Sequence, residues 1–167
     1  DGRTMPNNNM ERFTQRARQV LTLAEEAAAQ LKQPVIGTEH VLLGLMREHY
    51  GLASRVLKDL GLEQKPVVEF ILELSPIAET SQASHAPELS AETKQVLELA
   101  VEDARILEQR YIGTEHLLLG LVRQEDSAAV HILKDFNITP EQVRRQTQRL
   151  LQEPSPEIST SPDIGRP

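Results

Sequence analysis

The chain has 167 residues and a formal net charge of −7, with no cysteine, no tryptophan and few aromatic residues. The missing cysteines exclude disulfide bonds, thiolate metal sites and a cysteine nucleophile, and they fit a reducing compartment. The acidic charge argues against a protein that binds the phosphate backbone of nucleic acids, because such a protein needs a basic face. We find no apolar run as long as a membrane span and no signal or transit peptide, so we expect a soluble protein.

The composition favours helices, and no segment alternates apolar and polar residues long enough to predict a strand. Three segments do not fit a helical pattern. Residues 1–9 resemble a tag before a native start at Met5 or Met10, residues 76–88 a flexible connector, and residues 154–167 a disordered linker rich in proline and serine. Two foldable segments remain, 10–75 and 89–153.

The two foldable segments are copies of each other. Phe13–Leu74 aligns without gaps with Leu89–Leu150 at an offset of 76 residues, and about 25 of the 62 pairs are identical. Similarity at a fixed offset indicates two copies of one supersecondary unit. Two copies are too few for a solenoid. We therefore predict an all-α fold of two tandem four-helix repeats related by a pseudo-twofold axis.

The first two helices of each repeat have clear starting signals. The first is predicted over Thr14–Lys32 and over Ser90–Glu108, with apolar residues at helical spacing and a hydroxyl N-cap. The second is predicted to begin at Thr38 and at Thr114, where threonine is again the expected N-cap. Its apolar run is hydrophobic nearly all round, so this helix should be buried on several sides.

Glycine and capping residues mark the later parts of each repeat. Gly44 and Gly120 lie in the middle of the second helix, where glycine costs about 1 kcal/mol relative to alanine, so we expect a close helix crossing at both positions. The third helix should end at Gly61 and at Asn137, since these residue types tolerate the left-handed conformation best. The segment 139–142, Thr-Pro-Glu-Gln, predicts a capping box at the start of the last helix.

The tetrapeptide Gly-Thr-Glu-His occurs at residues 37–40 and again at 113–116. Metal ligands on one helix must be three or four positions apart, but this Glu and His are adjacent, and His49, His85 and His131 add no useful spacing. A threonine nucleophile is disfavoured because a hydroxyl N-cap already accepts backbone N–H groups. No nucleophile elbow and no P-loop are present. We therefore expect no enzymatic activity, no metal site and no cofactor in this chain.

A structural interpretation accounts for most of the tetrapeptide. Glycine allows the turn, threonine caps the helix, glutamate lies at the positive end of the helix dipole, and histidine packs beneath. We expect this structural role for His40 and His116. A structural role and a binding role both remain open for Glu39 and Glu115, because aspartate would complement the dipole equally well.

Four segments together carry a family resemblance: FTQRARQVLTLAEEAAAQL, VIGTEHVLLGL, LSAETKQVLELA and YIGTEHLLLGL. They resemble the Clp N-terminal repeat domain, most closely the ClpC type that precedes the two ATPase rings of an AAA+ unfoldase. The resemblance covers residues 10–153. It implies a domain that docks adaptor proteins and protein substrates for stress-related proteolysis by ClpP, with ATP and Mg²⁺ bound elsewhere in the parent protein.

In some ClpC-type proteins this domain also binds phosphoarginine on proteins marked for degradation. The resemblance implies that Glu39 and Glu115 pair with the guanidinium, and that Thr14 and Ser90 lie near the phosphate. A carboxylate and a guanidinium form a charge-assisted pair, and a capped helix N-terminus is an anion site. We expect each glutamate to act with the hydroxyl residue of its own repeat.

The two repeats differ in the charges beside the expected phosphate positions. Arg16 keeps a cation in the first repeat, in agreement with the family pattern. The second repeat has Glu92 where the family has arginine, although Lys94 supplies a cation two positions later. Because a carboxylate near a phosphate is unfavourable, we expect the site with Glu39 and Thr14 to bind phosphoarginine more tightly.

An alternative is a stand-alone accessory protein with the same fold, which regulates a Clp machine without an ATPase of its own. In either case the expected partners are adaptors and protein substrates, and neither nucleic acid nor a membrane. We expect the isolated domain to be monomeric and to work in the bacterial cytoplasm or the chloroplast stroma.

Overall fold

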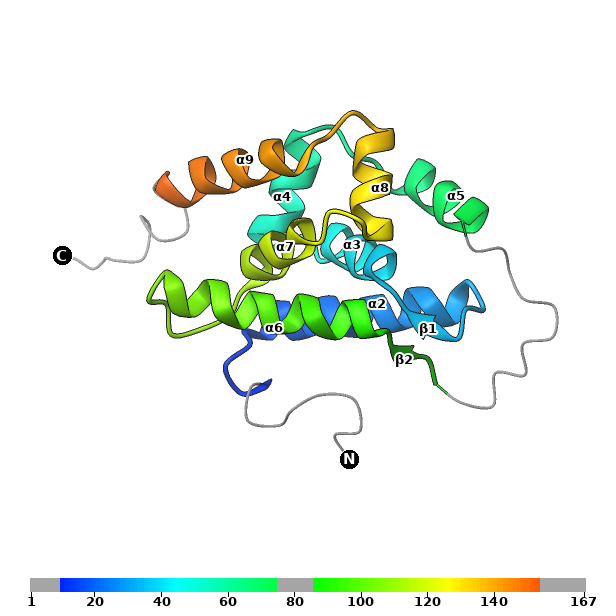
Figure 1. Ribbon diagram of the computed structural model, residues 1–167, viewed down its shortest axis with the longest axis horizontal. Helices are drawn as coiled ribbons and strands as arrows, with labels where there is room; N and C mark the ends of the chain where they lie inside the picture. Colours follow the sequence, from blue (N-terminus) through cyan, green and yellow to red (C-terminus); the bar gives the residue numbers. More distant parts are fainter. Residues whose placement is uncertain (1–9, 75–85, 154–167) are drawn as a thin grey trace.

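The computed structural model describes residues 10–74 and 86–153, and eight helices and two short strands lie within these ranges (Figure 1). The helices of the first repeat are α2 (Gln15–Gln30), α3 (Thr38–Arg47), α4 (Leu52–Asp59) and α5 (Gln64–Leu74). Those of the second are α6 (Ala91–Ile106), α7 (Thr114–Arg123), α8 (Ala128–Asp135) and α9 (Pro140–Gln152). The predicted all-α fold of two four-helix repeats is confirmed. None of the described helices is long and apolar enough to cross a membrane.

Parts of the predicted segment boundaries lie outside the described residues. This applies to the opening segment 1–9, to the tail 154–167 and to most of the connector 76–88. The end of the connector is described, and Glu88 there belongs to a short strand. The boundaries 10–75 and 89–153 of the two repeats stay predictions.

Corresponding helices of the two repeats begin 76 residues apart, as a pseudo-twofold relation requires. Their ends match as well, because Gly61 and Asn137 have φ values of 92° and 65° at equivalent positions after α4 and α8. The first helices end earlier than predicted. Lys32 and Glu108, expected to be helical, have φ values of 56° and 57°. This left-handed conformation cannot continue a right-handed helix.

Hydroxyl side chains cap the first helix of each repeat, as predicted. Thr14 Oγ1 accepts a hydrogen bond from the backbone N–H of Ala17 at 3.1 Å. Ser90 Oγ accepts one from the N–H of Thr93 at 3.0 Å. The predicted capping box at the start of α9 is also present. Each of these caps satisfies a backbone donor that the helix itself leaves without a partner.

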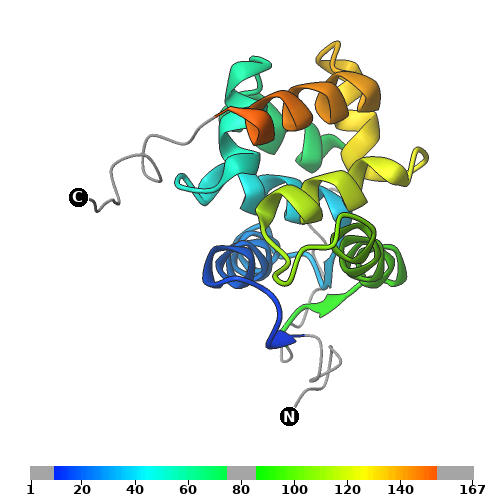
Figure 2. The same ribbon diagram turned by 90° about the vertical axis from the view of Figure 1, so that its left-hand side faces the viewer.

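The helices form three layers (Figures 1 and 2). The long helices α2 and α6 lie side by side in one outer layer. The middle layer consists of α3 and α7, and the shorter helices α4, α5, α8 and α9 cover it from the other side. Eight of the ten residues of α3 and seven of the ten residues of α7 are buried. The prediction that the second helix of each repeat is buried on several sides is therefore confirmed.

The mid-helix glycines lie where α3 crosses α2 and where α7 crosses α6. A Cβ atom on Gly44 would stand 2.5 Å from the carbonyl oxygen of Val20, and one on Gly120 would stand 2.9 Å from that of Val96. Real Cβ atoms essentially never approach a backbone oxygen so closely. The close crossings predicted from the sequence are confirmed, and glycine is needed in both because the backbones themselves are in contact.

Two-residue strands, which the sequence does not predict, join the repeats. β1 (Val35–Ile36) pairs in parallel with β2 (Glu88–Leu89). An isolated parallel bridge between Phe13 and Ile112 lies at the pseudo-equivalent place. Pairs this short leave no periodic pattern in a sequence, and their partners are distant in the chain. They fix the entry of one repeat's first helix against the other repeat.

The threonines of the tetrapeptide do not cap their own helices, so that prediction is wrong. The N-cap residues of α3 and α7 are the glycines at 37 and 113. Thr38 Oγ1 accepts instead from the backbone N–H of Ala129, in the first turn of α8, at 3.1 Å. Thr114 Oγ1 accepts from the N–H of Ala53, in the first turn of α4, at 3.2 Å. Each repeat therefore caps a helix of the other.

We predict that Gly44→Ala destabilises the protein although alanine is the better helix former. The expected loss is about 1–3 kcal/mol, because the new methyl group would have to push α2 and α3 apart. Gly120→Ala should cost less, since its Cβ has slightly more room. Urea denaturation of both variants tests this prediction. A Gly44→Ala protein as stable as the wild type would show that the crossing is not tight.

We predict that Thr38→Val lowers the free energy of unfolding by about 1–2 kcal/mol. Valine keeps the shape of the side chain but cannot accept the hydrogen bond, so the buried N–H of Ala129 loses its partner. Thr22→Val on the exposed face of α2 is the matched control and should be nearly neutral. Equal stability of the two variants in urea would contradict a role for this hydrogen bond between repeats.

Candidate functional site

The expected site residues meet across the repeats and not within them. The backbone N–H of Ser90 donates to the carbonyl of Ile36 at 3.1 Å, which brings the start of α6 beside the start of α3. The N–H of Thr14 donates to the carbonyl of Ile112 at 2.9 Å, so the start of α2 lies beside the start of α7. The predicted pairing within each repeat is therefore wrong.

Two candidate sites result from these contacts between the repeats, and the pseudo-twofold axis relates one to the other. We define the Glu115 site as Glu115 with Thr14, Arg16 and Tyr50. We define the Glu39 site as Glu39 with Ser90, Glu92 and Lys94. In both, a glutamate in the first turn of the second helix of one repeat lies near the capped N-terminus of the other repeat's first helix.

The glycine of each tetrapeptide makes room for the glutamate two positions later. A Cβ atom on Gly113 would stand 2.6 Å from Glu115 Oε1, and one on Gly37 would stand even closer to Glu39 Oε1. Each carboxylate thus lies over the glycine at the helix N-terminus, where the helix dipole favours negative charge. A larger residue at either glycine would displace the carboxylate.

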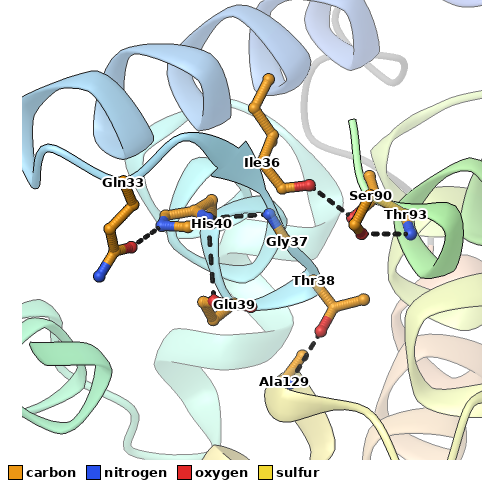
Figure 3. A network of polar contacts seen from close by, with 9 residues as sticks. All are labelled: Gln33, Ile36, Gly37, Thr38, Glu39, His40, Ser90, Thr93 and Ala129. Carbon is orange, nitrogen blue, oxygen red and sulfur yellow. Dashed lines mark hydrogen bonds and ion pairs between the residues drawn. The ribbon is translucent and has the colours of Figure 1, made fainter. Parts of the chain in front are cut away.

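His40 replaces the glutamate or glutamine of an ordinary capping box (Figure 3). Its Nδ1 accepts from the backbone N–H of Gly37 at 2.9 Å, and its Nε2 contacts Gln33 Oε1. The lone pair of Nδ1 therefore points at a donor, and the proton is on Nε2. Glu39 Oε2 lies 4.0 Å from Nδ1, but the ring is neutral and this contact is not an ion pair. Burial lowers the pKa of His40 from 6.5 to about 4.

His116 repeats the backbone contact but differs on the other side of its ring. Nδ1 accepts from the N–H of Gly113 at 2.9 Å. Nε2 is buried and has no hydrogen-bond partner among the described residues. Burial lowers the pKa of His116, while Glu115 and Asp103 raise it by a smaller amount. The structural role expected for both histidines is confirmed.

The carboxylate of Glu39 lies in an unfavourable electrostatic environment. Burial raises its pKa, its own backbone N–H lowers it, and the nearby charge of Glu92 raises it again. Its side chain is only 13% exposed. The Glu39 site therefore brings two carboxylates close together, and one of them is largely shielded from water.

The Glu115 site has a cation in the place of Glu92. Arg16 donates from Nη1 to the backbone carbonyl of Tyr50 at 2.8 Å, and its guanidinium lies 5.9 Å from the centre of the Tyr50 ring. Both side chains are exposed. Asp126 occupies the position equivalent to Tyr50 in the second repeat. The two sites therefore differ in charge at two equivalent positions.

Sequence reasoning identified Arg16 and missed Tyr50. Tyr50 belongs to the short loop between α3 and α4, in which no residue is identical between the repeats. A comparison of the repeats position by position would have found it, as the aromatic counterpart of an acidic residue.

Lys94 is exposed on α6, as an accessible cation requires, while the equivalent Arg18 donates to the carbonyl of Phe13 at 3.1 Å.

The described residues contain no group of three or more histidine, aspartate or glutamate side chains that could hold a metal ion. The glutamates and hydroxyl residues at the two helix junctions offer charged and hydrogen-bonding groups that suit a ligand. Their chemistry fits recognition of a charged group by hydrogen bonds.

The sequence matches the family described as Clp repeat N-terminal domain over residues 12–136 and again over residues 88–166. The chain belongs to this family. A Clp N-domain is a non-catalytic binding module of an ATPase, and the predicted family resemblance is confirmed. The first match spans the first repeat and α6 to α8 of the second, and the second match begins at the start of the second repeat.

Similar proteins include the "negative regulator of genetic competence ClpC/MecB" of Bacillus subtilis, 39% identical over 140 residues. That alignment covers 84% of this chain but 17% of the relative, so the chain spans about a sixth of the relative's length. The N-terminal domain of the chaperone ClpD from Arabidopsis thaliana has the same fold. It is 28% identical with a TM-score of 0.70, over 86% of this chain and 99% of that domain.

A further structure of this fold is a ClpV N-domain in complex with a VipB peptide. It is 19% identical to this chain with a TM-score of 0.67, and the match covers 90% of this chain and 94% of that one. At this identity the likeness describes the fold alone.

We predict that stability falls as the pH drops from about 6.5 towards 4. The unfolded chain binds a proton on His40 in this range and the native protein does not, so acid favours unfolding. The lowered pKa of His40 corresponds to a loss of about 3 kcal/mol in the free energy of unfolding. His116 acts in the same direction. Denaturation at pH 7.5, 6 and 5 measures the effect.

His40→Gln is the control for this pH dependence. Glutamine at the same position can still accept from the N–H of Gly37 but cannot titrate. The raised pKa of Glu39 has the opposite effect at lower pH, and the comparison with this variant separates the two contributions. Equal loss of stability in the variant and the wild type would show that His40 is not the titrating group.

Proposed function

We propose that this Clp N-domain docks adaptor proteins and protein substrates for a ClpC-type unfoldase that works with the ClpP peptidase. Family membership and the similarity to the ClpC/MecB protein support this proposal. A ClpV N-domain of the same fold binds a peptide, which is consistent with a docking role. The ATPase modules with their ATP and Mg²⁺, and work in a bacterial cytoplasm or chloroplast stroma, belong to the same proposal.

The ligand that the Glu115 site suits best is phosphoarginine. This group joins a planar guanidinium cation to a phosphate dianion, so a receptor must offer a carboxylate beside an anion site. Glu115 supplies the carboxylate. The N-terminus of α2, capped by Thr14, supplies the anion site, and Arg16 adds a positive charge in its first turn. This combination of an acid and a cationic helix start is the observation that carries the proposal.

The sequence led us to expect tighter phosphoarginine binding at the site with Glu39. Because each glutamate lies beside the first helix of the other repeat, we now expect the opposite order. Glu39 lies beside Ser90 and Glu92, so the site with Glu39 combines two carboxylates where a phosphate would bind. The Glu115 site has Arg16 at the equivalent position. We therefore expect the Glu115 site to bind phosphoarginine more tightly, and Lys94 to compensate only in part at the Glu39 site.

We predict that Glu115→Ala weakens phosphoarginine binding at least tenfold, because a hydrogen bond between charged groups contributes about 1.5–3 kcal/mol. Glu39→Ala should change the affinity much less. Isothermal titration calorimetry with phosphoarginine measures both. Folding should survive in each variant, since a charge in the first turn of a helix is worth about 0.3–1 kcal/mol.

Exchange of the cation between the sites is the matched control. Arg16→Glu should weaken the Glu115 site, whereas Glu92→Arg should strengthen the Glu39 site. Unchanged binding in a Glu39→Ala, Glu115→Ala double variant would reject both glutamates as ligands of the guanidinium and leave the tetrapeptide as a helix cap. A larger loss from Glu39→Ala than from Glu115→Ala would reject the ranking.

A further inference from the structure

Glu48 is a buried acid whose oxygen has no hydrogen-bond partner. It follows the last residue of α3 and is 8% exposed. Its Oε1 atom is buried and forms no hydrogen bond with any described residue. Burying a carboxylate oxygen without a donor is unfavourable, and native proteins rarely do so without a reason.

Glu48 lies at the edge of the Glu115 site. A Cβ atom on Gly51 would stand 3.1 Å from Glu48 Oε1 and 2.7 Å from Thr114 Oγ1, so these two oxygens lie on the same side of the loop. Thr114 precedes Glu115 in the chain. Tyr50 precedes Gly51 and receives the hydrogen bond from Arg16. The unpartnered oxygen therefore lies beside Gly51 and Thr114, the chain neighbours of the site residues Tyr50 and Glu115.

The second repeat shows which contact this position makes when it carries a donor. Gln124 is the equivalent of Glu48, and its Nε2 donates to the backbone carbonyl of Glu92 at 2.8 Å. In the first repeat the equivalent carbonyl belongs to Arg16. A carboxylate at this position cannot make the same bond, because a carboxylate and a carbonyl are both acceptors. Gln124 thus makes a hydrogen bond with Glu92, whereas Glu48 Oε1 makes none with any described residue.

A guanidinium is a group that suits a carboxylate oxygen without a donor. It is planar and carries several N–H donors in a fixed geometry, so it can bond to more than one oxygen at once. The guanidinium of Arg16 itself donates to Tyr50. Arg16 and Tyr50 are both exposed, so they can turn aside at little cost in packing when a ligand enters.

We propose that Glu48 is a second ligand carboxylate of the Glu115 site, and that it makes this site selective for phosphoarginine over phosphate esters. The inference rests on the proposed function and adds a residue to it. Glu115 and Glu48 both accept from the guanidinium, while the α2 N-terminus and Arg16 hold the phosphate. A phosphate ester has no guanidinium, so for such a ligand the charge of Glu48 is only repulsive.

The variant Glu48→Gln tests the proposal because it separates binding from stability. Its amide can donate to the carbonyl of Arg16, as Gln124 does to that of Glu92. The melting temperature should therefore stay the same or rise by about 2–4 °C, while the affinity for phosphoarginine falls about tenfold. Titrations with phosphoserine and inorganic phosphate should show equal or tighter binding, since a negative charge is removed.

Gln124→Glu in the second repeat is the matched control. It should lower the melting temperature, because it breaks an existing hydrogen bond, and it should leave the affinity of the Glu115 site unchanged. If Glu48→Gln retains full affinity while Glu115→Ala loses it, the role of Glu48 is rejected and the proposed function stands. If Glu48→Gln lowers the melting temperature and weakens all three ligands alike, Glu48 is structural and the inference is rejected. Full affinity in Glu115→Ala would reject the Glu115 site as the phosphoarginine site, and with it the part of the proposed function on which this inference rests.

Discussion

The exchange of helix caps between the two repeats is the constraint on which the rest of the structure depends. Thr38 and Thr114 each accept a backbone N–H from the first turn of a helix in the other repeat. Both threonines are buried, so each hydrogen bond is formed away from water, where an unmade bond would be costly. Together with the short strand pairs, these bonds set how the starts of α3 and α7 lie against the opposite repeat. The two candidate sites exist because of this placement.

The tetrapeptide is identical in both repeats because each of its residues has a separate physical task. Glycine leaves space for a carboxylate, threonine caps a distant helix, and histidine caps its own helix from the third position. Glutamate forms no hydrogen bond between helices within residues 10–74 and 86–153, and it is the one residue of the four that is not fully buried. A structural explanation therefore accounts for three of the four residues, and the glutamate is the one for which we propose a binding role.

Local physics was enough to predict most of the helices and much less of the site. The caps at Thr14 and Ser90, the left-handed end at Asn137 and the glycine crossings all depend on residues close in the chain or on backbone sterics, so the sequence carries them. The hydrogen bond from Thr38 to Ala129 joins residues 91 positions apart, and nothing in either segment marks its partner. The pairing of Glu39 with the second repeat was missed for the same reason. Local patterns predict helices, while tertiary packing decides which helix ends meet.

The exchange between repeats also has an evolutionary consequence. Two separate copies of one repeat, related by a true twofold axis, would have to carry two identical sites, because every substitution would appear in both. In a single chain each position can change alone. Arg16 and Glu92, Tyr50 and Asp126, and Glu48 and Gln124 are pairs in which this freedom has been used. Joining the copies in one chain thus allows the two sites to differ in charge and hence in the ligand that each binds best.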